Sequence, residues 1–219
     1  FDGLHSGHQK LFELAKKYKT KYKSKVGVVT FDPIPKMFFN KQIKNYRISN
    51  LNQKVTYLKR FGVDFVINKK FDKNFSKISY YDFIKNILSK KLRSKFIFVS
   101  NNFRFGHKRE GNVPMLKKYE NNFNYKVINP TPLKKNKKIV SSTIIRKLLE
   151  NGKLSKANSF LKRNWEIEGK VQKGRMMGKK IGFPTCNIDI GNYVIAKPGV
   201  YAVKTKVNDK KNFTKELPI

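Results

Sequence analysis

Cysteine is almost absent from this chain: Cys186 is the only one among 219 residues. A single cysteine excludes an internal disulfide and suits a reducing compartment, so we expect a cytoplasmic protein. No apolar run approaches the roughly 18 residues that a membrane span needs, so we expect no membrane partner. An initiator methionine is also absent. Because the chain begins Phe-Asp-Gly, in the middle of a motif, we expect a fragment of a longer protein.

Acidic residues are scarce: 14 Asp and Glu stand against 50 Lys and Arg, which gives a formal net charge of +36. Such a charge is typical of proteins that bind nucleic acid or an anionic membrane surface. A nucleic-acid footprint gathers on one face, however, whereas lysine here is spread over nearly every segment together with Asn and Ile. We therefore expect a general compositional bias, no dedicated nucleic-acid site, and small phosphorylated molecules as partners.

Helical and strand patterns alternate through the first three quarters of the chain. Hydrophobic residues make up 39% of the sequence, enough for a packed core. Helical spacing and capping residues predict helices at about 8–19, 49–61, 79–88, 114–120, 141–149 and 154–161. Short apolar runs predict strands at 26–31, 63–67, 96–99 and 125–128. This alternation predicts an α/β fold with a Rossmann-like, doubly wound parallel sheet that binds ligands at the carboxyl ends of its strands.

Details at the ends of these elements can be predicted too. Ser49 is the predicted cap of the second helix, and Pro33 and Pro35 are predicted to end the first strand in an extended loop. No strand precedes the turn at Phe1, so we expect the sheet to lack its first, central strand.

The pattern changes after Asn164 to short β-rich runs at 165–171, 182–190 and 200–207, separated by Gly and Pro. These runs predict a β-barrel domain too short to be complete. We therefore expect two domains, 1–163 and 164–219.

The stretch His5-Ser6-Gly7-His8 is the first candidate site. Two histidines three residues apart lie on one side of a helix's first turn. Gly7 has no side chain, so an anion can approach the backbone there. Helix amides and two imidazoles there could stabilise charge on a transferring phosphoryl group. Taken alone, the stretch is equally compatible with a structural turn. Metal ligation is the poorer reading, because no cluster of Cys, His and carboxylate accompanies it.

Two later stretches have the same ambiguity. Residues 96–106 set a buried strand against a polar, aromatic and basic turn, which suits a nucleotide but is also an ordinary strand exit. Residues 140–146 place hydroxyls at a helix start, where they can be caps or phosphate ligands, and Arg146 one turn later could reach the outer phosphates. The purely structural alternative is a serine-capped helix with a solvent-exposed arginine.

Taken together, these stretches resemble the bacterial bifunctional riboflavin kinase/FAD synthetase family, within the HxGH nucleotidyltransferase superfamily. The resemblance in the first domain rests on residues 1–8, 30–35, 102–106 with Arg109 and Gly111, and 141–143 with Arg146. In the second domain it rests on residues 169–171, Gly174, Gly178, residues 181–188 with the Pro-Thr-x-Asn signature, and 198–202.

The resemblance implies that the FMN phosphate attacks the α-phosphorus of ATP, with Mg²⁺ neutralising charge, to give FAD and pyrophosphate. It implies a catalytic set of His5, His8, Asn102 and Arg146. It implies ATP ligands at Gly7, Ser141, Ser142, Thr143 and Thr185, and flavin contacts at Phe31, Pro33, Pro35 and Phe105. In the kinase domain, which would convert riboflavin to FMN with ATP, it implies that Thr185 and Asn187 hold the metal.

The sequence departs from the family pattern at several points. Ser100 stands where the family usually has Gly, and Lys162-Arg163-Asn164 replaces a usual Gly-Arg-Pro. By the same resemblance the kinase's catalytic carboxylate lies beyond residue 219, so we expect no riboflavin phosphorylation by this stretch alone. Two other functions stay open: an HxGH transferase acting on a different phosphate ester, and a basic module that binds RNA.

Overall fold

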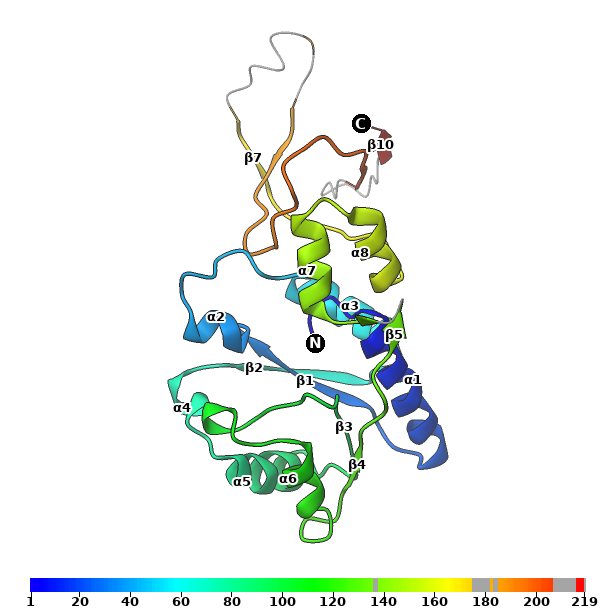
Figure 1. Cartoon of the computed structure of the whole chain (residues 1–219), viewed down its shortest axis with the longest axis vertical. Helices are drawn as coiled ribbons and strands as arrows, with labels where there is room; N and C mark the ends of the chain where they lie inside the picture. Colours follow the sequence, from blue (N-terminus) through cyan, green and yellow to red (C-terminus); the bar gives the residue numbers. More distant parts are fainter. Residues whose placement is uncertain (136–137, 175–181, 183–184, 207–215, 219) are drawn as a thin grey trace.

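The computed structural model describes residues 1–135, 138–174, 182, 185–206 and 216–218. Helices and strands alternate in the N-terminal part of the chain, up to Leu161 (Figure 1). The order is α1 (Ser6–Lys21), β1 (Gly27–Asp32), α2 (Pro35–Phe39), α3 (Leu51–Arg60), β2 (Phe65–Lys70), α4 (Lys73–Ser76), α5 (Tyr80–Asp82) and the π-helix η1 (Phe83–Lys91). There follow β3 (Phe96–Phe98), the 3₁₀ turn η2 (His107–Arg109), α6 (Val113–Lys118), β4 (Lys126–Ile128), β5 (Lys134–Lys135), β6 (Lys138–Ile139), α7 (Ser142–Glu150) and α8 (Leu154–Leu161).

Two pairs of strands in this part are parallel, which confirms the predicted mixed α/β class, while β5 and β6 pair antiparallel. β1 pairs with β2, so that Gly27 lies opposite Phe65, and β3 pairs with β4, with Phe96 opposite Lys126. Parallel strands need a crossover, and α3 provides the one between β1 and β2. Within the described residues the two pairs are not hydrogen-bonded to each other, so the predicted single doubly wound sheet does not appear there as one sheet. The central strand expected before Phe1 stays a prediction.

The C-terminal part is less regular than the predicted barrel. β7 (Val171–Gln172) pairs antiparallel with β8 (Asn187–Ile188), and β9 (Lys204–Lys206) pairs antiparallel with β10 (Glu216–Pro218). The described residues do not form a closed barrel. Parts of the predicted runs, with Gly178 and Ile181, lie outside the described residues. No helix in the described ranges is long and apolar enough to cross a membrane.

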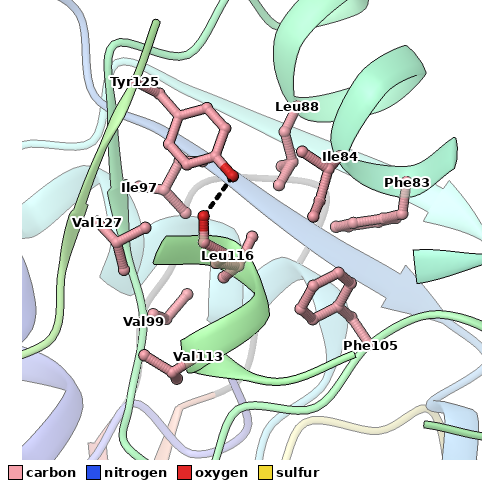
Figure 2. Close-up of a cluster of buried hydrophobic side chains, with 10 residues drawn as sticks. All are labelled: Phe83, Ile84, Leu88, Ile97, Val99, Phe105, Val113, Leu116, Tyr125 and Val127. Atoms are coloured by element: carbon pink, nitrogen blue, oxygen red, sulfur yellow. Dashed lines mark hydrogen bonds between the residues drawn. The ribbon is translucent and has the colours of Figure 1, made fainter. Parts of the chain in front are cut away.

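Three clusters of buried apolar side chains form the core of the N-terminal part. The largest lies between η1, β3, α6 and β4, and Figure 2 shows its ten residues: Phe83, Ile84, Leu88, Ile97, Val99, Phe105, Val113, Leu116, Tyr125 and Val127. At its centre the Tyr125 hydroxyl donates to the carbonyl oxygen of Leu116 at 2.6 Å, which satisfies a buried polar pair. A second cluster joins α7 and α8, which lie side by side in Figure 1, and the third packs α1 against β1 and α3.

The N-terminal part, up to Leu161, and the C-terminal part share some of this core. Val194, 1% exposed, packs in the cluster of α7 and α8. The Tyr57 hydroxyl donates to Glu166 Oε2 at 2.7 Å, and Trp165 Nε1 donates to the carbonyl of Ile48 at 3.0 Å. The Tyr193 hydroxyl donates to Gln53 Oε1 at 2.7 Å. Residues just before and within α3 therefore face the C-terminal part directly.

Two predictions about element ends were wrong. Asn50, not Ser49, caps α3: its side chain accepts from Gln53 N, and the Gln53 side chain accepts from Asn50 N, a reciprocal capping box. Pro35 does not continue an extended loop but begins α2, because proline fits the first helical position, where no N–H is needed. The helices predicted to begin near 79 and 141 are capped by Ser79 and Ser141, whose side chains accept from Asp82 N and Ile144 N.

We expect Leu116→Ala to destabilise the chain by about 2 to 5 kcal/mol, because Leu116 is fully buried and its loss leaves a cavity. Chemical denaturation measures the change in the free energy of unfolding. Val200→Ala is the control, since Val200 is fully exposed and should change this free energy by less than about 0.5 kcal/mol. Equal effects of the two substitutions would contradict the packing described.

Candidate active site

The N-terminal turn is held by the buried carboxylate of Asp2. Arg146 Nη2 donates to Asp2 Oδ2 at 2.6 Å, and the backbone N–H groups of Ile48 and Ser49 donate to the same carboxylate at 3.2 and 3.4 Å. The main-chain oxygen of Asp2 accepts a hydrogen bond from Ser142 Oγ at 2.8 Å. One residue therefore ties the turn both to the segment before α3 and to the first turn of α7.

Gly3 and Leu4 fix the direction of this turn. Gly3 has φ +74°, and a Cβ at this position would lie 2.8 Å from Ile48 Cγ2, so only glycine fits. Its carbonyl oxygen accepts from Arg163 Nη2 at 2.8 Å. Leu4 is fully buried in the cluster of α1, β1 and α3. The turn is therefore part of the core, and it sets where α1 begins.

His5 and His8 lie together at the N-terminus of α1. Their rings are stacked with centroids 3.7 Å apart and an angle of 21° between planes. Within the described residues the Nδ1 atoms of both rings, and Ser6 Oγ, are buried without a hydrogen-bond partner. The first amides of a helix also have no partner within the helix. This corner of the molecule therefore offers several unused donors to an anion.

Burial keeps both imidazoles neutral at pH 7. Desolvation, helped by the nearby N-terminal amino group, lowers the pKa of His5 from 6.5 to about 4. Desolvation, followed by the charge of His5, lowers the pKa of His8 well below its usual value. A neutral imidazole still has one N–H, so each ring can donate one hydrogen bond to charge that develops on a phosphate.

The start of α7 lies beside the start of α1. A Cβ on Gly7 would lie 3.5 Å from the carbonyl oxygen of Val140, so the two helix ends approach closely. Ser141 caps α7 by accepting from Ile144 N at 3.3 Å, Ser142 bonds to the turn, and Thr143 is exposed. Two positive helix ends therefore converge near Gly7, as a phosphate site requires.

Arg146 was expected to reach outward to phosphates, but its side chain points inward to Asp2. It is 7% exposed, and besides Asp2 it binds the carbonyl oxygen of Tyr46 through Nε at 2.8 Å. Its guanidinium also lies 3.6 Å from the centroid of the Tyr46 ring. The physical reason is the carboxylate of Asp2, which is buried and needs a counter-ion.

The second stretch supplies one exposed and one buried residue. Asn102 is exposed after β3, and its Oδ1 accepts from Ser100 Oγ at 2.9 Å. Phe105 is 7% exposed and belongs to the core, where its ring centroid lies 5.3 Å from that of Phe83 (Figure 2). Phe105 therefore anchors the loop after β3 to the core, and Asn102 in the same loop is accessible to a ligand.

The loop after β1 borders an aromatic patch made of Phe31, Phe38, Phe39, Phe71 and Phe75. The Phe31 ring lies 5.6 Å from Phe71 and 5.3 Å from Phe75, centroid to centroid. Phe39 is 67% exposed, so part of this patch faces solvent. Pro33 and Pro35 frame the loop, and Asp32, the last residue of β1, forms an ion pair with Arg47.

Thr185 and Asn187 are exposed in the C-terminal part, Asn187 within β8. The contacts described for them do not join them to the histidine pair. The described residues contain no group of three or more His, Cys, Asp or Glu side chains that could hold a metal.

Sequence reasoning gave no role to Asp2 or to Lys54, which also lie at this site. Lys54 is 2% exposed, and its Nζ donates to Thr30 Oγ1 at 3.1 Å. A signal was available: Lys54 stands three and four residues before Tyr57 and Leu58, on the buried face of α3. A lysine on an apolar face is uncommon enough to mark a site.

Comparisons with known proteins bear on both halves of the chain. The family model described as FAD synthetase matches residues 1–144, and the one described as riboflavin kinase matches residues 161–217. A bifunctional riboflavin kinase/FMN adenylyltransferase of Buchnera aphidicola (subsp. Schizaphis graminum) is 39% identical over 97% of this chain and 69% of its own length. The chain belongs to the bifunctional riboflavin kinase/FAD synthetase family.

Other relatives of this family agree. The protein of the same name from Escherichia coli K12 is 34% identical over 93% of this chain and 65% of its own length. The chain therefore spans about two thirds of the relatives it matches. A crystal structure from Streptococcus pneumoniae, named as a macrolide-efflux protein, has a TM-score of 0.83 at 28% identity, covering 99% of this chain and 69% of that one. Its name differs from the family's, but its fold is similar.

We expect the chain to lose stability as the pH falls from 6.5 towards 4. The depressed pKa of His5 means that the unfolded state takes up a proton in this window before the folded state does, so stability is complete above 6.5. The contribution of His5 to this loss is about 3 kcal/mol at most, and His8 adds to it in the same direction. Denaturant unfolding at several pH values measures it, and His5→Gln should reduce the slope. An unchanged slope in that variant would show that His5 is not the titrating group.

Proposed function

We propose that the first part of this chain, residues 1–163, transfers AMP from ATP to FMN and releases pyrophosphate. One observation carries the proposal: a stacked pair of neutral histidines with unused Nδ1 atoms, at a helix start that adjoins the start of α7. Membership of the family supplies the choice of ATP and FMN. Buried neutral donors at converging helix ends suit a phosphoryl group whose charge grows during transfer.

The chemistry requires little from the protein beyond placement and charge. An oxygen of the FMN phosphate forms a bond to the α-phosphorus of ATP, and the bond from that phosphorus to the leaving pyrophosphate breaks. His5 and His8 donate hydrogen bonds to the phosphate oxygens, and Asn102 helps to orient the nucleotide. Gly7 allows close approach of the α-phosphate to the amides of α1.

ATP is held, in this proposal, along the start of α7. The backbone amides there, with Ser141, Ser142 and Thr143, would receive the triphosphate. Arg146 contributes its positive charge from beneath, because its guanidinium is fixed by Asp2. The flavin ring lies on the other side, against the loop of Phe31, Pro33 and Pro35 and the exposed part of the aromatic patch. Phe105 packs under the loop after β3.

Mg²⁺ would be carried mainly by the phosphates of ATP, where it neutralises negative charge. This ion prefers oxygen ligands and often takes few from the protein, which agrees with the lack of a carboxylate cluster among the described residues. In residues 164–219, which we assign to the riboflavin kinase domain, Thr185 and Asn187 provide such oxygens. Both side chains are exposed and so accessible to a second Mg-ATP.

The deciding experiment supplies the full-length protein with ATP, Mg²⁺ and FMN, and detects FAD and pyrophosphate by chromatography. We expect both products in equal amounts, and pyrophosphate only when FMN is present. Release of pyrophosphate with another phosphate ester but not with FMN would favour a different HxGH transferase. Tight, strongly salt-dependent RNA binding that survives His5→Ala, without FAD, would favour the RNA-binding alternative.

We expect His8→Ala to lower kcat for FAD formation by about 10² or more, because one preorganised donor to the phosphates is lost. The melting temperature should change little. His107→Ala is the matched control: its ring bonds to the carbonyl of Ser76, away from the pair, and its kcat should stay near that of the wild type. A wild-type rate for His8→Ala would remove His8 from the mechanism.

A further inference from the structure

Lys54 is a buried cation for which no carboxylate partner is close. Both acidic side chains of the turn and loop are already engaged: Asp2 with Arg146, and Asp32 with Arg47. Within the described part of the chain no carboxylate oxygen lies within 4 Å of Lys54 Nζ, and its one described hydrogen-bond partner is the neutral hydroxyl of Thr30. Burying an ammonium group in this way costs stability unless another charge compensates it.

The place of Lys54 indicates which charge that is. Thr30 precedes Phe31 in β1, two residues before the strand ends at Asp32, so Nζ lies near the carboxyl end of the strand, from which the loop of the proposed flavin side starts. Lys54 also lies within electrostatic reach of the turn, because its charge helps to lower the pKa of His8. Burial in turn lowers the pKa of Lys54 itself, and the charges of Asp2 and Asp32 act against that shift. The ammonium therefore lies at Thr30, near the carboxyl end of β1 and the loop of the proposed flavin side.

We propose that Lys54 is the counter-charge for the phosphate of the flavin substrate, and that it distinguishes phosphorylated from unphosphorylated flavin. This inference rests on the proposed function. In an in-line transfer the attacking phosphate and the leaving pyrophosphate lie on opposite sides of the α-phosphorus. With ATP along α7 and the flavin ring at the aromatic patch, the phosphate of FMN comes to lie between the histidines and the loop, where Lys54 has its charge.

The electrostatic argument favours the flavin phosphate over those of ATP. The start of α7 already carries capping hydroxyls, helix amides and Arg146. On the flavin side the loop itself contributes Asp32, and Arg47 is paired with it. Lys54 is therefore the buried cation of this side that lacks an ion pair in the described structure, and a low-dielectric setting makes its field strong.

The test uses the full-length enzyme and compares two variants at one position. Lys54→Met keeps the buried chain without the charge, and replacement of a buried charge by an apolar group is often tolerated. We expect the KM for FMN to rise about tenfold or more in FAD formation, with the KM for ATP within about twofold. Lys54→Arg keeps the charge and should recover most of the loss. Lys59→Gln, an exposed lysine of the same helix, is the matched control and should match the wild type.

Each other outcome has a defined meaning. An unchanged KM for FMN in Lys54→Met overturns the inference, as does an equal rise in both KM values. A higher KM for ATP alone assigns Lys54 to the triphosphate instead. If neither variant at this position folds, Lys54 is a structural residue and the inference is wrong. If the wild-type enzyme makes no FAD from FMN, the proposed function itself fails, whatever the variants do.

Discussion

The buried ion pair between Asp2 and Arg146 is the contact on which the rest of the site depends. Asp2 also accepts from two backbone N–H groups before α3, and its carbonyl oxygen accepts from Ser142 at the start of α7. Breaking a buried pair leaves an uncompensated charge, so these segments hold together or separate together. The position of the histidine pair follows, because α1 begins at Ser6, four residues after Asp2. A phosphate site formed by two helix ends needs such a fixed distance between them.

Neutral and charged groups of the site lie at different depths around the Asp2–Arg146 ion pair. Neutral histidines stand nearest to the proposed phosphates, while the cations Arg146 and Lys54 lie beneath the surface and are screened little by water. The large net charge of the chain is mostly elsewhere, on exposed lysines, where solvent weakens it. A few buried charges can therefore matter more to the reaction than the many that give the chain its net charge of +36.

Much of the fold could be predicted from the sequence, because amphipathic and apolar runs alternate clearly. The parallel pairs β1–β2 and β3–β4, and the caps Ser79 and Ser141, follow from local patterns. The cap at Asn50 could not be chosen over Ser49 by residue type alone, since both side chains are good caps and the reciprocal bond with Gln53 decided. The buried places of Arg146 and Phe105 depend on partners distant in sequence, Asp2 and Phe83. Periodicity does not reveal such contacts.

The contacts between α3 and the C-terminal part have a consequence for how the molecule can be divided. Hydrogen bonds join residues after 164 to Tyr57, Gln53 and Ile48. Val194 also packs in the cluster of α7 and α8. A polypeptide cut at the predicted boundary near 163 would expose apolar surface and leave buried polar groups without partners. The core around α3, α7 and α8 therefore includes residues as far as Val194, and the predicted boundary near 163 does not separate two independent cores.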